Sequence, residues 1–156
     1  MIFKKLRPYI ISILIALAVG VLSGIATNSG MPIYERLIKP PLTPPSAVFP
    51  IVWPILYILM GIGAAIIWES TDKKCGTALS IYAFQLVFNA IWSVLFFGFE
   101  AYLLSFIWLI LLWLLIIMMI ISFYRIRPIA GLLQIPYLLW VTFAGYLNFM
   151  IWQLNR

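Results

Sequence analysis

The side chains of this chain that could do chemistry are mostly indoles, phenols and carboxamides. Its 156 residues include seven Trp, eight Tyr and eleven Phe, but no His and a single cysteine, Cys75. Without His the chain lacks the usual acid/base group at neutral pH and the commonest metal ligand, and one cysteine cannot form an internal disulfide. No serine–base pair or pair of carboxylates lies within the apolar stretches. The sequence therefore predicts no conventional catalytic constellation, no metal site and no cofactor.

Aromatic and amide side chains recur at helical spacing in three apolar stretches. Phe49, Trp53 and Tyr57 follow an i, i+4, i+8 pattern. At about 100° per residue, two further stretches each place such residues on one face of a helix. The first of these faces contains Tyr82, Gln85, Asn89, Trp92, Ser93 and Phe96, and the second contains Gln134, Tyr137, Trp140, Ala144 and Asn148.

Two interpretations of these three faces remain open. Polar residues in apolar helices often hydrogen-bond between helices and hold a bundle together. Flat aromatic surfaces with a few neutral amides also suit a pocket for a planar, largely apolar ligand, because amides orient a ligand without burying a charge. Trp140 lies near the middle of its stretch, where an indole N–H needs an acceptor in the protein or in a ligand. Trp68 and Trp152, at the ends of theirs, are typical of membrane-interface anchors.

The elements that must position these faces are membrane-spanning helices. The sequence is 65% hydrophobic and 9% charged, with a mean hydropathy of +1.13, which is far from the composition of soluble domains. A helical span takes about 20 apolar residues. The chain is therefore predicted to be an all-α integral membrane protein, a single domain over residues 1–156 built as a bundle of five transmembrane helices. The expected spans are residues 9–26, 47–68, 77–97, 101–124 and 129–152.

The first span has two features that allow more than one interpretation. Lys4, Lys5 and Arg7 precede it, as in a secretory signal, but its apolar run exceeds the usual length of such signals. Gly20 and Gly24 form a small-xxx-small pattern. That pattern is typical of a close helix contact, including a dimer face, but glycine is also simply tolerated in membrane helices.

A proline-rich loop, residues 27–46, separates the first two spans, and we call it the lid. Prolines fix φ and remove backbone donors, so the lid is predicted to be a stiff loop of short pieces. A loop this long is either disordered or a working element such as a cover over a site. The apolar residues of the lid favour a cover over a site. Outside the lid, Pro54 and Pro136 predict kinks in the second and the fifth span. The lid prolines are Pro32, Pro40, Pro41, Pro44 and Pro45, and its apolar residues include Tyr34, Leu37, Ile38 and Leu42.

The net charge of +6 reflects basic residues that flank the spans, so no nucleic-acid partner is expected.

An inside N-terminus places seven basic residues inside and three outside, as the positive-inside rule requires. The lid and the C-terminus are then outside, and a bacterial plasma membrane is the expected location. No charged residue lies deep in a span, which disfavours ion-coupled pumping. The inner basic residues are Lys4, Lys5, Arg7, Lys73, Lys74, Arg125 and Arg127, and the outer ones are Arg36, Lys39 and Arg156.

Three stretches together resemble one known family. They are residues 39–61 (KPPLTPPSAVFPIVWPILYILMG), 82–97 (YAFQLVFNAIWSVLFF) and 136–148 (PYLLWVTFAGYLN). In order and spacing they are similar to the TspO/MBR family, the tryptophan-rich sensory proteins related to the mitochondrial translocator protein (peripheral benzodiazepine receptor). The resemblance covers nearly the whole chain from about residue 33 to residue 155.

The resemblance implies a five-helix membrane protein, often a homodimer, whose first loop closes over a pocket. The family binds porphyrins such as protoporphyrin IX and isoquinoline carboxamide or benzodiazepine-type drugs, its animal members bind cholesterol, and some bacterial members break down protoporphyrin in light. By motif position, Trp53 and Trp140 match the tryptophans tied to that photochemistry. Together with the three faces, the resemblance implies a ligand-binding set of Tyr34, Pro44, Phe49, Trp53, Tyr57, Asn89, Trp92, Tyr137, Trp140, Ala144 and Leu147.

The sterol-recognition pattern of the animal relatives is not met in this chain. Where that pattern has a Tyr followed within five residues by Lys or Arg, this chain has Phe149 with Gln153 beyond it. The expected function is therefore a membrane receptor for porphyrins and related hydrophobic ligands, with light- and oxygen-dependent porphyrin degradation as an open enzymatic question. A carrier of sterols, porphyrins or other lipophilic molecules, and a structural subunit whose aromatic residues only pack, are the alternatives.

Overall fold

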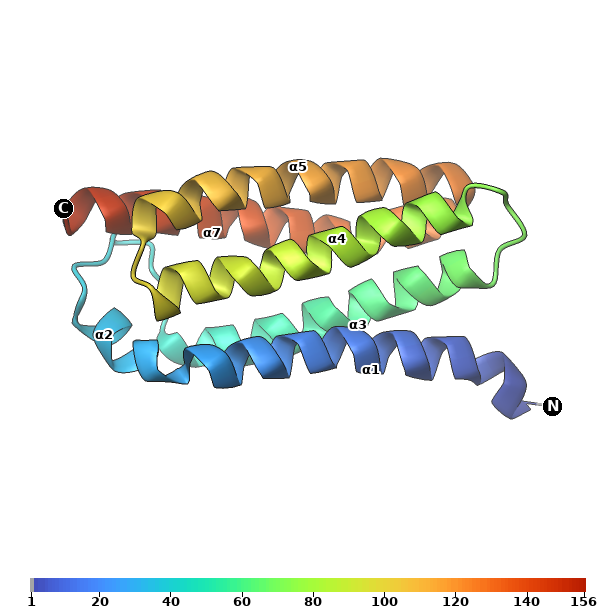
Figure 1. Cartoon of the computed structure of the whole chain (residues 1–156), viewed down its shortest axis with the longest axis horizontal. Coiled ribbons are helices and arrows are strands. Elements are labelled where there is room, and N and C mark those ends of the chain that lie inside the picture. The colour runs from blue at the N-terminus through green and yellow to red at the C-terminus, as the bar shows by residue number, and fades with distance from the viewer. Residues whose placement is uncertain (1) are drawn as a thin grey trace.

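The computed structural model describes residues 2–156, and Met1, part of the predicted domain, lies outside the described residues. Five long helices run side by side along the molecule, and the described residues contain no strand (Figure 1). Five helical segments are long and apolar enough to cross a membrane. The predicted all-α five-helix membrane bundle is thus confirmed. The long helices are α1 (Ile2–Thr27), α3 (Phe49–Trp68), α4 (Cys75–Ser93), α5 (Tyr102–Ile126) and α7 (Ile135–Leu154).

The lid lies at one end of the bundle, and part of it is helical. A 3-10 turn, η1 (Asn28–Gly30), continues into α2 (Met31–Arg36), and a second turn, η2 (Ser46–Val48), leads into α3. Irregular structure was expected over this whole segment. Pro32 lies in the first turn of α2, where a missing N–H costs no hydrogen bond. The prolines at 40–45 then prevent the helix from continuing.

Prolines affect the two predicted kink sites differently. Pro54 lies inside α3, which remains one helix from Phe49 to Trp68. The fifth span is interrupted before Pro136, because α6 (Pro128–Leu132) ends and α7 begins at Ile135. Pro136 therefore occupies the first turn of a new helix, where proline is favoured.

The odd number of spans places the two chain ends at opposite ends of the bundle (Figure 1). The lid, the α4–α5 connection and the C-terminus share one end. The α4–α5 connection begins with a π-helical turn, η3 (Val94–Gly98), and continues through Glu100, which has a φ of 55°. Single π turns often mark functional positions in helices.

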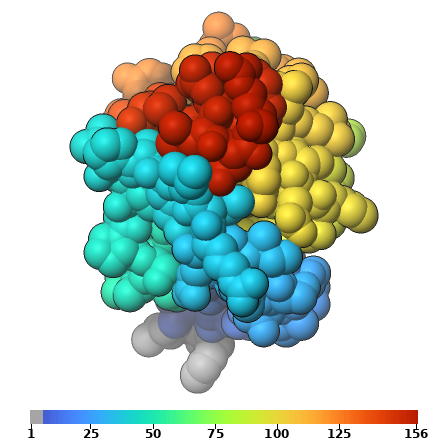
Figure 2. All heavy atoms as spheres, turned by 90° about the vertical axis from the view of Figure 1, so that its left-hand side faces the viewer, coloured from blue at the N-terminus to red at the C-terminus, as the bar shows by residue number. Residues whose placement is uncertain are grey.

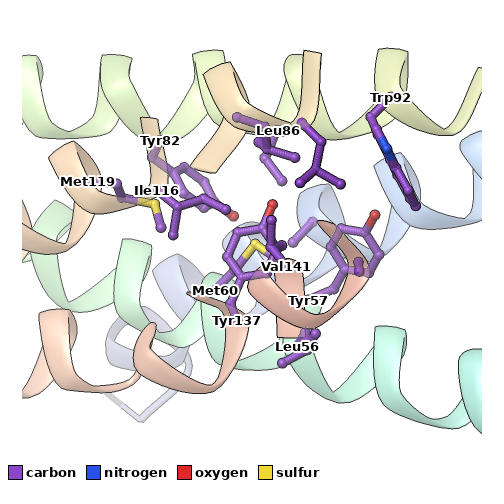
Figure 3. Packing of buried hydrophobic residues seen from close by; sticks show 14 of the residues in the cluster. Leu56, Tyr57, Met60, Tyr82, Leu86, Trp92, Ile116, Met119, Tyr137 and Val141 are labelled. Carbon is purple, nitrogen blue, oxygen red and sulfur yellow. The ribbon is translucent and has the colours of Figure 1, made fainter. Parts of the chain in front are cut away.

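Two glycines allow α1 and α3 to approach closely. A Cβ at Gly61 would collide with the backbone of Ile13, and one at Gly20 would collide with the ring of Tyr57. The core between α3, α4, α5 and α7 is filled by large apolar residues and by two tyrosines, Tyr57 and Tyr137, that face α4 (Figure 3). Its fully buried members include Met60, Ile67, Leu112, Ile116, Met119 and Phe123.

Candidate functional site: an aromatic cavity beneath the lid

A cavity of about 620 Å³ lies at the lid end of the bundle. Three groups of residues enclose it: one face of α1, the first turns of α3 with the end of α4, and the lid. Its volume falls within the range of about 300–1,000 Å³ typical of small-molecule sites. It is lined by Leu17, Gly20, Val21, Ser23, Gly24, Thr27, Met31, Tyr34, Ser46, Ala47, Phe49, Pro50, Trp53, Pro54, Tyr57, Trp92, Ser93 and Phe97.

Trp53 is the centre of the aromatic wall of this cavity. Its ring centroid lies 5.7 Å from that of Tyr57, with an interplanar angle of 31°, and 6.4 Å from that of Trp92, at 33°. Trp92 in turn stacks on Phe96 at 5.6 Å and 28°. Three flat aromatic rings, tilted by 31° and 33° from one another, therefore line one wall of the cavity, and a planar apolar molecule can pack against such a surface.

The lid is held over the cavity by one buried aromatic side chain. Tyr34, 6% exposed, lies among Phe49 at 6.2 Å, Phe96 at 6.1 Å and Phe97 at 5.5 Å between ring centroids. At the start of the lid, a Cβ at Gly30 would collide with the carbonyl of Phe97. The π-helical turn η3 therefore supplies both the backbone surface that Gly30 contacts and two of the rings that enclose Tyr34.

A chain of hydrogen bonds lies behind the aromatic wall. The Tyr57 hydroxyl, at the cavity edge, donates to Asn89 Oδ1 at 2.8 Å, and Asn89 Nδ2 donates to the Tyr137 hydroxyl at 2.8 Å. Tyr137 donates to Gln85 Oε1 at 2.9 Å. Asn89, Tyr137 and Gln85 are each at most 1% exposed. These amides and hydroxyls join α3, α4 and α7, which is the bundle-holding role considered for polar residues in apolar helices.

A second polar group ties α4 to α5 and α7 near the lid. Trp92 Nε1 donates to Asn148 Oδ1 at 3.0 Å, and the Ser105 hydroxyl lies 3.1 Å from the same oxygen. Asn148 Nδ2 donates to the carbonyl of Tyr102 at 2.8 Å. The hydrogen bond to Asn148 fixes the orientation of the Trp92 indole. Its N–H is bonded within the bundle, and its ring lines the cavity.

The structure brings together five of the residues expected to bind ligand, and it separates the others from the cavity. Tyr34, Phe49, Trp53, Tyr57 and Trp92 line the cavity. Asn89 and Tyr137 form the hydrogen-bonded layer behind it. Ala144 and Leu147 are buried on α7, and Pro44 lines a second pocket, within the lid, together with Tyr34 and Ser46.

Trp140 occupies the edge of the inward face of α7 and does not line the cavity. It is partly buried and lines a separate groove between α3 and α7 with Val52, Leu56 and Phe143. Its ring lies 5.9 Å from that of Phe49, at an angle of 70°. Phe49 also lines the cavity, so its ring lies between Trp140 and the cavity.

Sequence reasoning placed no site residue on the first span, yet α1 forms one side of the cavity. Gly20, Ser23, Gly24 and Thr27 lie there at helical spacing and have small or short polar side chains. A search for such a stripe opposite an aromatic face could have found them. Gly20 faces Tyr57 of the same chain, so it serves a close contact between α1 and α3.

Comparison with known proteins agrees with this architecture. The model of the TspO/MBR family matches residues 12–153. The tryptophan-rich protein TspO of Chlorobaculum tepidum is 42% identical over 126 residues, 78% of each chain. The tryptophan-rich protein TspO of Archaeoglobus fulgidus is 37% identical over 145 residues, 92% of this chain and 94% of its own. The translocator protein of Bos taurus is 35% identical over 126 residues, 79% of this chain and 75% of its own. The resemblance in the sequence is confirmed, and this five-helix chain belongs to the TspO/MBR family.

Proposed function

We propose that this protein is a membrane receptor that binds protoporphyrin IX or a related planar hydrophobic molecule in the cavity beneath the lid. The observation that carries the proposal is the aromatic wall formed by the adjacent rings of Trp53, Tyr57 and Trp92. The isoquinoline carboxamide and benzodiazepine-type ligands expected from the family are also flat and largely apolar, so the same wall suits them.

The polarity of the cavity restricts how a porphyrin can lie in it. None of the lining residues carries a charged side chain, and the hydroxyls of Ser46 and Ser93 are among its few polar groups. A carboxylate inside such a cavity would lose its hydration without gaining an ionic partner. The macrocycle is therefore expected to lie against Trp53 with its propionates directed past the lid toward water.

Titration of the purified protein with protoporphyrin IX tests the proposal through the shift of the porphyrin absorption band. Replacement of Trp53 by Ala should weaken the affinity about tenfold, because a large stacked ring is lost. The matched control is Trp68→Ala at the far end of the same helix, where the indole is 50% exposed and far from the lid. Equal affinity in the wild type and Trp53→Ala would contradict this site.

Light-dependent degradation is the chemical extension of the proposal. An excited porphyrin passes its energy to dissolved oxygen, and the oxygen species formed then oxidises the macrocycle or a nearby indole. Trp53 in the wall is the nearest candidate, and Trp140 lies beyond Phe49. Illumination with protoporphyrin IX should yield a product in air and none without oxygen. Undiminished product in the Trp53→Phe/Trp140→Phe variant would remove both indoles from the chemistry.

A carrier for lipophilic molecules is the second candidate, and one observation favours it. The cavity reaches the outer surface of α1 at Val21, which is 60% exposed, and at Gly24. A cavity that reaches the lipid-facing side could exchange its ligand with the bilayer. Protein-dependent flux of a porphyrin into proteoliposomes, compared with empty vesicles, would favour the carrier over a receptor that only binds.

We further propose that the protein works as a homodimer in a bacterial plasma membrane, with its N-terminus inside. The seven-to-three distribution of basic residues supports the orientation, and the family resemblance supports the dimer. Cross-linking in native membranes followed by mass measurement tests the dimer, and a monomer at all protein densities would contradict it.

A further inference from the structure

The last residues of the chain contact the middle of the lid. Just after α7 ends at Leu154, Asn155 Oδ1 accepts a hydrogen bond from the Ile38 backbone N–H at 2.9 Å. Asn155 Nδ2 donates to the Ile38 carbonyl at 2.9 Å and to the Ile151 carbonyl at 2.8 Å. Figure 2 shows this end of the molecule, with the C-terminal segment packed directly beside the lid.

This arrangement uses the carboxamide of Asn155 in a way that few side chains could reproduce. A carboxamide offers two N–H donors and one carbonyl acceptor, and here both N–H donors and the oxygen are engaged. Two of these hydrogen bonds join Asn155 to the backbone N–H and the backbone carbonyl of Ile38, which are the groups that a neighbouring β-strand would bond. A carboxylate at this position could accept from Ile38 N–H but would face two carbonyl oxygens without a donor.

The position of Ile38 makes this contact important for the lid. Ile38 lies between Tyr34 and Ser46, two lid residues that line the cavity. The other polar contacts within residues 37–45 are local: Thr43 bonds to Pro40, and Lys39 Nζ bonds to the carbonyls of Glu35 and Leu37. Among the described residues, Asn155 thus provides the long-range polar attachment of this half of the lid.

We propose that Asn155 is a latch that holds the lid closed and thereby sets the rate at which a ligand enters and leaves the cavity. The effect on ligand exchange rests on the proposed binding function, whereas the effect on the lid does not. Tyr34 in its aromatic enclosure holds the first half of the lid, and Asn155, just beyond α7, provides the long-range polar attachment of the second half. Opening therefore requires Ile38 to separate from Asn155.

Hydrogen exchange of the full-length protein in nanodiscs tests the latch without any ligand. Asn155→Ala should accelerate exchange in residues 37–43 about three- to tenfold, the range expected for lost hydrogen bonds. Asn155→Asp should do so at least as strongly, because its carboxylate faces two carbonyls. The control is Gln153→Ala, an exposed neighbour on α7, which should leave the lid unchanged. If exchange rises only at residues 151–154, Asn155 merely caps α7 and the latch is wrong.

Stopped-flow mixing with protoporphyrin IX then tests the functional part. Both the association and the dissociation rate should increase about three- to tenfold in Asn155→Ala, with a smaller change in affinity, because the latch acts on the closed lid with or without ligand. Faster lid exchange with unchanged porphyrin rates would overturn the link between latch and ligand. A wild-type protein that binds no porphyrin contradicts the proposed function, while the exchange experiment still decides whether the latch exists.

Discussion

The hydroxyl of Tyr137 accepts a hydrogen bond from Asn89 and donates one to Gln85 at the centre of an apolar bundle. In such surroundings an unpartnered polar atom is costly because water cannot replace the missing partner. The amides of Asn89 and Gln85 are therefore engaged with tyrosine hydroxyls, and that of Asn148 is engaged with the Trp92 indole. Contact with a ligand is left mainly to the aromatic rings and to the hydroxyls of Ser46 and Ser93.

Replacement of Tyr137 by Phe should lower the free energy of unfolding by about 1–3 kcal/mol, because it leaves Asn89 Nδ2 and Gln85 Oε1 without this partner. The measurement is unfolding in mixed detergent micelles. The control, Tyr124→Phe, removes the same atom from a side chain that is 50% exposed and should change the stability by less than about 0.5 kcal/mol. Equal losses in the two variants would show that the network contributes no stability.

At the scale of the elements, α1 has two roles that its sequence left open. Gly20 gives the ring of Tyr57 room to lie against the helix, and Gly24 stands at the cavity edge with no atom near its missing Cβ. The two glycines of the small-xxx-small pattern thus have different roles. Gly20 packs against Tyr57 within the chain, and Gly24 leaves the cavity wall open.

The two glycines should respond in opposite ways to alanine. Gly20→Ala should destabilise the protein by about 1–3 kcal/mol, since the new methyl group displaces a Tyr57 ring that is itself bonded to Asn89. Gly24→Ala should be neutral or stabilise α1 by up to about 1 kcal/mol, because alanine is the better helix former. Thermal unfolding of both variants measures the difference, and a reversed order of stability would contradict the contact at Gly20.

For the whole molecule, the five crossings fix which connections share a side of the membrane. Glu100 belongs to the α4–α5 connection and Asp72 to the α3–α4 connection, and both residues are exposed. These two connections lie at opposite ends of the bundle, the first at the lid end (Figure 1). The distribution of basic residues predicts that the lid end is outside. The orientation thereby decides whether the lid meets the extracellular or the cytoplasmic solution.

Cysteine labelling tests this orientation in intact cells. In a Cys75→Ser background, which lacks the only native cysteine, Glu100→Cys should react with a membrane-impermeant maleimide, and Asp72→Cys should react only after the membrane is permeabilised. Labelling after permeabilisation is the control for accessibility in both variants. The reverse pattern would contradict the proposed orientation.

Several features of the protein could be predicted from local sequence, although element ends could not. The five spans follow from apolar length alone, and the aromatic faces of α3 and α4 follow from helical periodicity. The helical half of the lid and the break before Pro136 differ from expectation. Proline is compatible with a first helical turn as well as with a loop or kink, so its presence does not decide between them.

The sequence by itself determined that the chain is a bundle of five membrane helices with aromatic and amide residues on inward faces, because length and periodicity are properties of each segment alone. Only the tertiary structure decided that the rings of Trp53, Tyr57 and Trp92 face a cavity bounded on one side by α1, while Asn89 and Tyr137 lie behind it and Trp140 beside it. The physical reason is that a cavity forms between helices. Its lining therefore depends on how each helix is rotated and how closely it packs, and long-range contacts such as Gly61 on Ile13 and Gly20 on Tyr57 set both.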